Sequence, residues 1–282
     1  MKASAINSRD TKWVFIKKGS CSRTLFYILN REFGNPLEEE ERAADLLAGG
    51  ILQQGYQCGL LLGAVLAMGA ESHRKSQTST EAIHLAVQAT QKIMESFSKR
   101  AGSVDCLDIT EIDFKQNGGL ARFLVKGKFV GCFRLADRWA PEAIKAAKEA
   151  MPDKPADTSD ESGTSDQLVS CASEVVRKMG GNEQEMAIVA GLAGGVGLSG
   201  NACGALSAAV WMHALRWCRE HPGKSATKVP GANQALEAFF AATDYEFLCE
   251  KITGKCFKTV DAHSEFICAG GCKELLDALA AS

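Results

Sequence analysis

The sequence contains few prolines and few aromatic residues. Only 6 of its 282 residues are proline and 7% are aromatic, whereas 27 are glycine. This composition favours closely packed helices over sheets or disorder. An excess of charge of one sign is also lacking, because the net charge is only -2. We therefore expect neither nucleic acid nor an anionic membrane surface as a partner.

Residues 1–10 contain no apolar run of the kind that forms a secretory signal. We expect a cytoplasmic protein, in which thiols stay reduced and cysteines more often bind metal or perform redox chemistry. The chain has 11 cysteines, a smaller share than the roughly 8–10% found in small disulfide scaffolds. Their odd number excludes complete pairing within the chain.

One uncharged segment has the length of a membrane span. Residues 186–215 contain no Lys, Arg, Asp or Glu, and a span needs about 20 apolar residues. The segment is rich in Gly, Ala and Ser, however, and Gly200 with Asn201 interrupts it. Its counterpart at 42–70 contains Arg42 and Asp45. We predict two buried helices joined by a glycine turn in each segment, and no membrane insertion.

The chain contains an internal repeat. Residues 40–65 align with residues 185–210 at a constant offset of 145, and 11 of these 26 positions are identical. The alignment extends in both directions with small gaps. Between the copies, residues 151–166 are polar and rich in Pro, Ser and Asp. We therefore predict a first repeat at 1–150, a polar linker at 151–166 and a second repeat at 167–282.

Periodicity predicts a mainly α fold, with two homologous helical domains related by a pseudo-twofold axis. Apolar residues follow helical spacing over 22–32 and 80–98, and a buried helix is expected over 59–68. A further helix is predicted over 141–150, with Pro141 in its first turn.

Four cysteines recur in the same order in each half. The two quartets are Cys21, Cys58, Cys106 and Cys132 in the first half, and Cys171, Cys203, Cys249 and Cys272 in the second. Each cysteine is expected near the end of an element, where a helix N-terminus would lower the pKa of the thiol. We predict that each quartet gathers to bind a metal or cluster, because packing alone does not explain why all four recur.

Three readings of the quartets remain open. Iron–sulfur ligation takes four thiolates without one fixed spacing. Structural zinc usually uses closely spaced pairs such as C-x₂₋₄-C, and neither quartet contains one. The third reading is thiol–disulfide exchange between neighbouring cysteines without metal.

Three further cysteines occur only in the second half. Cys218 lies on an apolar helix and is interpreted as a packing residue. Cys256 and Cys268 are further candidates for the metal site, because they crowd sulfur toward the second quartet. Among the histidines, only His263 is a candidate ligand or proton donor, although a surface position is favoured for it. If one half performs the chemistry, we expect it in the second half, around Cys249, Cys256, Cys268 and Cys272.

The segments 55–63 and 200–208 resemble the central motif of the redox-active protein family named for its cysteine pattern, C–GCAxxG–C–C. The eight quartet cysteines match that pattern twice, over nearly the whole chain. In both copies Cys precedes Gly, unlike the family label. Leu60 and Ala208 also replace the usual Ala and the last Gly of the motif.

The resemblance implies a fold and a chemistry. The family is associated with anaerobes, and a similar domain accompanies the haems of split-Soret cytochromes, where it is linked to an iron–sulfur centre. This chain lacks C-x-x-C-H, so no covalent haem c is expected. We expect iron–sulfur clusters, [4Fe-4S] or [2Fe-2S], and electron transfer to a redox partner protein.

The chain would then be an oxidoreductase or a subunit of one, and a homodimer is one option. A metal-free thiol–disulfide redox protein and a structural zinc-binding assembly subunit are the alternatives.

Overall fold

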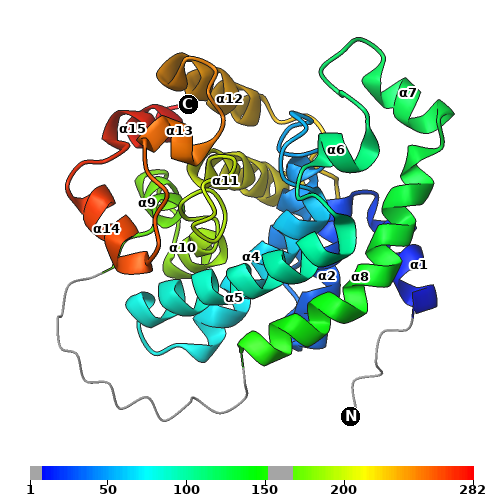
Figure 1. Ribbon diagram of the computed structural model, residues 1–282, viewed down its shortest axis with the longest axis horizontal. Helices are drawn as coiled ribbons and strands as arrows, with labels where there is room; N and C mark the ends of the chain where they lie inside the picture. Colours follow the sequence, from blue (N-terminus) through cyan, green and yellow to red (C-terminus); the bar gives the residue numbers. More distant parts are fainter. Residues whose placement is uncertain (1–7, 152–167) are drawn as a thin grey trace.

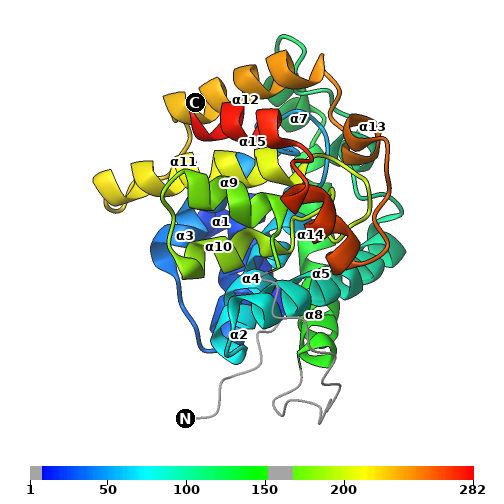
Figure 2. The same cartoon turned by 90° about the vertical axis from the view of Figure 1, so that its left-hand side faces the viewer.

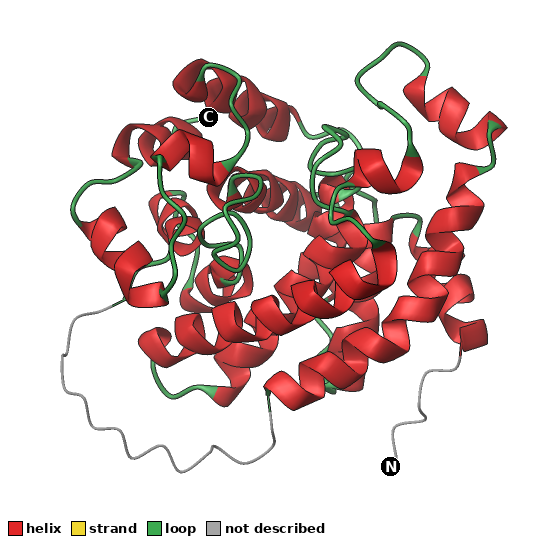
Figure 3. Cartoon of the chain, viewed as in Figure 1, coloured by secondary structure: helices red, strands yellow, loops and turns green. Residues whose placement is uncertain are grey.

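The computed structural model describes residues 8–151 and 168–282. Within these two ranges all regular structure is helical, which confirms the mainly α prediction (Figure 3). In the described residues, extended backbone pairs only at two isolated antiparallel bridges, Gln57 with Asp105 and Ala202 with Leu248. The predicted linker lies outside the described residues, except for Met151. The domain boundaries therefore stay predictions.

Residues 8–151 form eight α-helices and one 3-10 helix, and Figure 1 shows how they are arranged. They are α1 (Ser8–Lys18), α2 (Cys21–Glu32), α3 (Glu38–Ala43), η1 (Ala44–Leu47), α4 (Gly59–Lys75), α5 (Ser79–Ala101), α6 (Cys106–Thr110), α7 (Gly119–Val125) and α8 (Lys128–Ala150). The second half follows with α9 (Cys171–Lys178), α10 (Glu183–Ala190), α11 (Gly204–Glu220), α12 (Pro230–Thr243), α13 (Cys249–Thr253), α14 (Val260–Cys268) and α15 (Lys273–Ala280). Taken in order, α2 to α8 correspond to α9 to α15.

The centre of the molecule is formed by α4 and α11, which are apolar almost all round and therefore buried. Within the first half α4 packs on α2, and within the second α11 packs on α9. Across the halves α10 packs on α4, and α3 packs reciprocally on α11. Gly69 allows the first of these contacts, because a Cβ there would lie 2.2 Å from the Ile188 carbonyl oxygen. The repeated elements thus exchange equivalent contacts, as the predicted pseudo-twofold relation requires.

No helix in the described ranges is long and apolar enough to cross a membrane. Residues 186–215 instead form most of α10 and α11 with a turn between them, as predicted.

The predicted helix over 141–150 has the wrong start. Pro141 lies inside α8, which begins at Lys128 and runs without interruption to Ala150. An internal proline removes one backbone donor and clashes with the preceding turn. Here the apolar face of α8 buries Trp139 and Ala143 on both sides of the proline. This packing offsets the local cost and keeps the helix continuous.

Candidate functional site

Three cysteines of the first quartet occupy helix N-termini. Cys21 and Cys106 are the first residues of α2 and α6, and Cys58 is the N-cap of α4. The fourth, Cys132, lies inside α8 rather than at an end. The prediction that each cysteine lies near an element end is therefore wrong for Cys132, because α8 starts four residues earlier.

The second quartet repeats these positions. Cys171 and Cys249 begin α9 and α13, and Cys203 is the N-cap of α11. Cys272 is the N-cap of α15 and has a left-handed backbone, with φ of 59°. Three of the four structural positions are thus identical in the two halves.

Backbone pairing holds the second and third cysteines of each quartet side by side. In the first half Cys58 donates its amide to the Val104 carbonyl at 2.7 Å, and Cys106 donates to the Tyr56 carbonyl at 2.7 Å. These bonds flank the bridge between Gln57 and Asp105.

The second half contains the same arrangement. There Cys203 donates its amide to Phe247 at 2.9 Å, and Cys249 donates to Asn201 at 2.7 Å. The sequence separations of 48 residues between Cys58 and Cys106 and 46 residues between Cys203 and Cys249 are therefore closed by main-chain hydrogen bonds.

A left-handed turn supports the first cysteine of each quartet. All five residues of 49–53 and all five of 194–198 have positive φ. Ile51 and Val196 are β-branched residues, for which this conformation is strained. The turn directs the amide of Gly49 to the sulfur of Cys21.

The equivalent turn in the second half directs the amide of Gly194 to the sulfur of Cys171. The strained backbone in both halves therefore lies at the candidate site.

The thiols of each quartet gather into one group. Burial raises the pKa of Cys58, and the proximity of Cys21, Cys106 and Cys132 raises it further.

The second quartet behaves in the same way. Burial raises the pKa of Cys249, followed by the effects of Cys171, Cys203 and Cys272. The structure thus brings together the cysteines that the repeat selected, four from each half.

The expected lowering of thiol pKa by helix N-termini does not occur. Burial raises the pKa of Cys132 to about 12 and that of Cys272 to about 11. Amide hydrogen bonds to Cys21 and Cys203 lower the pKa, but desolvation of the thiolate outweighs them. Without a metal, the sulfurs are therefore protonated thiols at neutral pH.

Four thiolates are the donors that iron–sulfur clusters use. Within 8–151 and 168–282, no three or more His, Cys, Asp or Glu side chains are arranged to hold one ion. The four sulfurs of each half are nevertheless close enough to raise one another's pKa, and a cluster of several irons spreads its ligands more widely than one ion does. If iron–sulfur clusters bind, the quartet thiolates would hold them and the clusters would supply one-electron chemistry.

The two quartets differ in the space beside them. The second quartet lines a cavity of about 20 Å³, whereas three cysteines of the first quartet line one of about 700 Å³. In the second half α14 closes the cavity with Phe266 and Ile267, and Figure 2 faces the side that carries α12 to α15. In the first half the equivalent α7 stands away from the body (Figure 1), and only its Gly119 is buried.

An acidic residue that the sequence interpretation did not select lies beside the first quartet. Asp45 lines the large cavity, and its Oδ1 accepts a hydrogen bond from the Ser20 hydroxyl at 2.6 Å. Burial raises its pKa to about 6, against the effects of Ser20 and Arg23. The sequence signal that could have identified Asp45 is its place as the single acid among the alanines and leucines of residues 43–48.

His263 lies at the second quartet. The surface position favoured for it is therefore wrong. Its side chain lines the small cavity, and the residue is only 2% exposed. It packs edge-on against Phe257, and its Nδ1 has no hydrogen-bond partner. Burial lowers its pKa to about 4, so the imidazole is neutral at pH 7.

The three unrepeated cysteines stay outside both cavity walls. Cys218 is wholly buried in the core on α11, as a packing residue would be. Cys256 and Cys268 are exposed. Cys256 is close enough to raise the pKa of Cys249, and its Sγ lies 3.9 Å from the Leu198 carbonyl oxygen.

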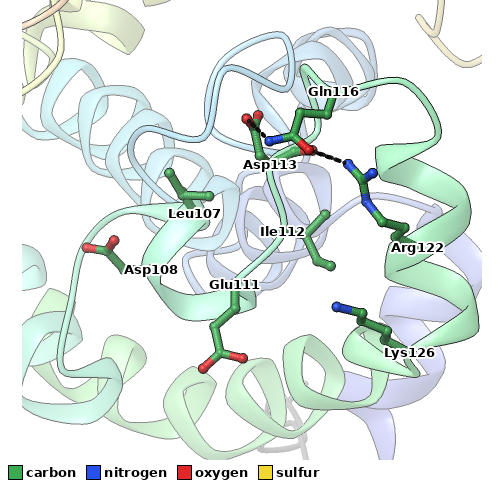
Figure 4. A pocket seen from close by; sticks show the side chains of 8 residues that line it. All are labelled: Leu107, Asp108, Glu111, Ile112, Asp113, Gln116, Arg122 and Lys126. Carbon is green, nitrogen blue, oxygen red and sulfur yellow. Dashed lines mark hydrogen bonds between the residues drawn. The ribbon is translucent and has the colours of Figure 1, made fainter.

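A second hollow, of about 690 Å³, lies between α6 and α7 (Figure 4). Three of its polar side chains pair with one another. Gln116 donates to Asp113 at 3.1 Å, and Arg122 donates to Gln116 at 3.3 Å (Figure 4). No cysteine lines it, so it does not belong to the quartet sites.

Comparison with known proteins identifies one family. The chain matches none of the curated proteins and none of the solved structures with which it was compared. A family model described as "Putative redox-active protein (C_GCAxxG_C_C)" matches residues 20–140 and again residues 165–281. The two matches together contain all eight quartet cysteines and most of the chain. The chain therefore belongs to the C_GCAxxG_C_C family, as two tandem copies of its domain.

Proposed function

We propose that this protein is an electron-transfer protein with one iron–sulfur cluster in each half, bound by the thiolates of each quartet. The observation that carries the proposal is the convergence of four sulfurs in each half, three of them from the same helix positions. Thiolate is a soft ligand, and a set of four suits iron–sulfur clusters. The wall of the second cavity contains no Asp or Glu that would compete as a ligand.

The raised thiol pKa values argue against free thiol chemistry. A reactive thiol needs a lowered pKa, because the thiolate is the nucleophile. Burial raises the pKa of all eight quartet cysteines. A bound cluster would replace the protons and stabilise the sulfurs as thiolates.

Asymmetry between the halves suggests different tasks for the two clusters. The second site is closed and would only pass electrons, whereas the first borders a large cavity. The sequence favours the second half as the place of the chemistry. The cavity beside the first quartet supports the first half instead. A redox partner protein would then deliver electrons at the second half.

Iron and sulfide analysis of anaerobically purified protein tests the proposal. We expect a coloured protein that contains iron and acid-labile sulfide, both of which are lost when the quartets are replaced by serine. A colourless protein that reconstitutes no cluster would contradict it. Zinc in place of iron would favour a structural subunit, and paired mass shifts on reduction would favour a metal-free thiol–disulfide protein.

A further inference from the structure

The cavity beside the first quartet has the size of a small-molecule site. Its volume of about 700 Å³ falls within the roughly 300–1,000 Å³ of typical ligand pockets. Both halves form it, because Ser225 and Asn233 of the second half face α1, α7 and α8 of the first. Cys21, Cys106 and Cys132 line its wall.

The wall is strongly aromatic in a chain that has few aromatic residues. Five of the 13 phenylalanines line this one cavity, namely Phe15, Phe114, Phe123, Phe129 and Phe133. Phe15 and Phe133 meet edge to face at 4.6 Å between ring centroids, and Phe114 and Phe123 lie 5.3 Å apart. Such a wall suits a flat apolar molecule, because aromatic rings pack against one another in offset or edge-on arrangements.

One carboxylate belongs to the wall of the cavity. The Asp45 side chain is only 7% exposed, and its Oδ1 accepts a hydrogen bond from Ser20. The Nη1 atom of Arg23 lies 3.7 Å from Oδ2, and the Ala226 amide is close enough to lower the pKa of the carboxyl. Asp45 is the only acid among the residues that line the cavity. A ligand O–H group that reaches its carboxylate would gain a charge-assisted hydrogen bond.

The second half has neither a large cavity beside its quartet nor an acid at the position equivalent to Asp45. At the offset of 145, Ala190 occupies the position of Asp45. In the second half, residues of α14 line the small cavity beside the quartet. In the first half, the equivalent helix α7 stands away from the body, and the cavity is large. The buried acid therefore occurs in the same half as the large cavity.

We propose that this cavity binds a small aromatic molecule with a phenolic hydroxyl group. Its ring packs against the phenylalanines, and its hydroxyl donates to the Asp45 carboxylate. The ligand then lies beside the thiols of the first quartet. The proposal concerns binding, and it stands whether or not the quartet holds iron.

Calorimetric titration of the full-length, anaerobically purified protein with 4-ethylphenol tests this site. We expect one site per chain. Asp45→Asn should weaken binding about tenfold or more, which is the usual effect of losing a hydrogen bond to a charged group. In 4-ethylanisole a methyl ether replaces the hydroxyl. It should bind wild type more weakly, and Asp45→Asn should change its affinity little.

Two further variants separate binding in the cavity from effects on folding. Leu124 lines the cavity from α7 and is 55% exposed, so Leu124→Trp should fill the mouth without disturbing the core and weaken both probes. Asp108→Asn, in the neighbouring polar hollow, should leave binding unchanged. Circular dichroism verifies the fold of each variant. Absence of saturable binding at millimolar 4-ethylphenol, or equal affinity in wild type, Asp45→Asn and Leu124→Trp, would overturn the proposal.

Discussion

The rings of Tyr56 and Phe247 stack with centroids 3.9 Å apart and planes at 7°. Tyr56 belongs to the first half and Phe247 to the second. The Tyr56 carbonyl accepts the amide of Cys106, and the Phe247 carbonyl accepts the amide of Cys203. One aromatic contact therefore joins the backbone supports of both quartets, and it links the two repeats where the sites lie.

Loss of this stack should weaken the contact between the halves. Aromatic pairs contribute about 0.5–1.5 kcal/mol beyond their buried area. We expect a coupling energy of this size from a double-mutant cycle with Tyr56→Ala and Phe247→Ala, measured by urea unfolding. Tyr56→Phe keeps the ring and should leave stability almost unchanged. Additive effects of the two alanine variants would show that the rings do not interact.

The last glycine of the first motif should be intolerant of alanine, although the second motif contains alanine there. A Cβ at Gly63 would lie 1.9 Å from the Ser22 carbonyl oxygen, because α4 and α2 touch at this point. Gly63→Ala should lower the free energy of unfolding by about 1–3 kcal/mol or more.

The second repeat offers the matched control. Ala208→Gly places a glycine inside α11 and should cost only about 1 kcal/mol. Thermal unfolding of both variants measures the difference. A Gly63→Ala variant as stable as wild type would mean that the two helices can separate at no cost.

Much of this fold and site could be predicted from the sequence. Eleven identities at one offset revealed the duplication, and the helical spacing of apolar residues located α2, α4 and α5. The recurrence of the cysteines selected eight residues that the structure then brings together. These signals are local or repeated, so they survive without knowledge of the tertiary contacts.

The asymmetry between the halves could not be predicted in the same way. Whether α7 or α14 covers its site depends on packing between distant elements, and so does the continuation of α8 through Pro141. Helix N-termini favour thiolate, but the burial that reverses this preference at Cys21 is a tertiary property. The surface position predicted for His263 is wrong for the same reason, because the burial of a single histidine leaves no periodic pattern in the sequence.

Asp45 should make the protein less stable as pH rises. Its pKa is about 6 in the folded state and 3.8 without burial. The folded state thus holds the extra proton between pH 4 and 6, and the free energy of unfolding falls across that window. One pKa unit corresponds to about 1.4 kcal/mol, so the loss is about 3 kcal/mol. Asp45→Asn should remove this loss, as urea unfolding at several pH values would show.

His263 should have the opposite effect. Its pKa is about 4 in the folded state and 6.5 without burial. Here the unfolded state holds the extra proton, so the free energy of unfolding rises by about 3 kcal/mol between pH 4 and 6.5. In wild type the two contributions oppose each other.

Urea unfolding of matched variants separates the two groups. Relative to wild type, Asp45→Asn should become more stable as pH rises through this window, and His263→Phe should become less stable. Parallel pH profiles for wild type and both variants would contradict the two assignments.

Separate replacement of Cys58 and Cys203 should remove one cluster each. The two cysteines are the N-caps of α4 and α11 and belong to different quartets, so each serine variant leaves the other quartet intact. We expect each variant to retain about half of the iron and sulfide of wild type, because four thiolates hold a cluster. Cys218→Ala removes a buried thiol outside both cavities and should keep all the iron, which separates ligand loss from loss of packing. If Cys58→Ser loses all the iron while Cys203→Ser loses none, the second quartet holds no cluster and supports the fold only.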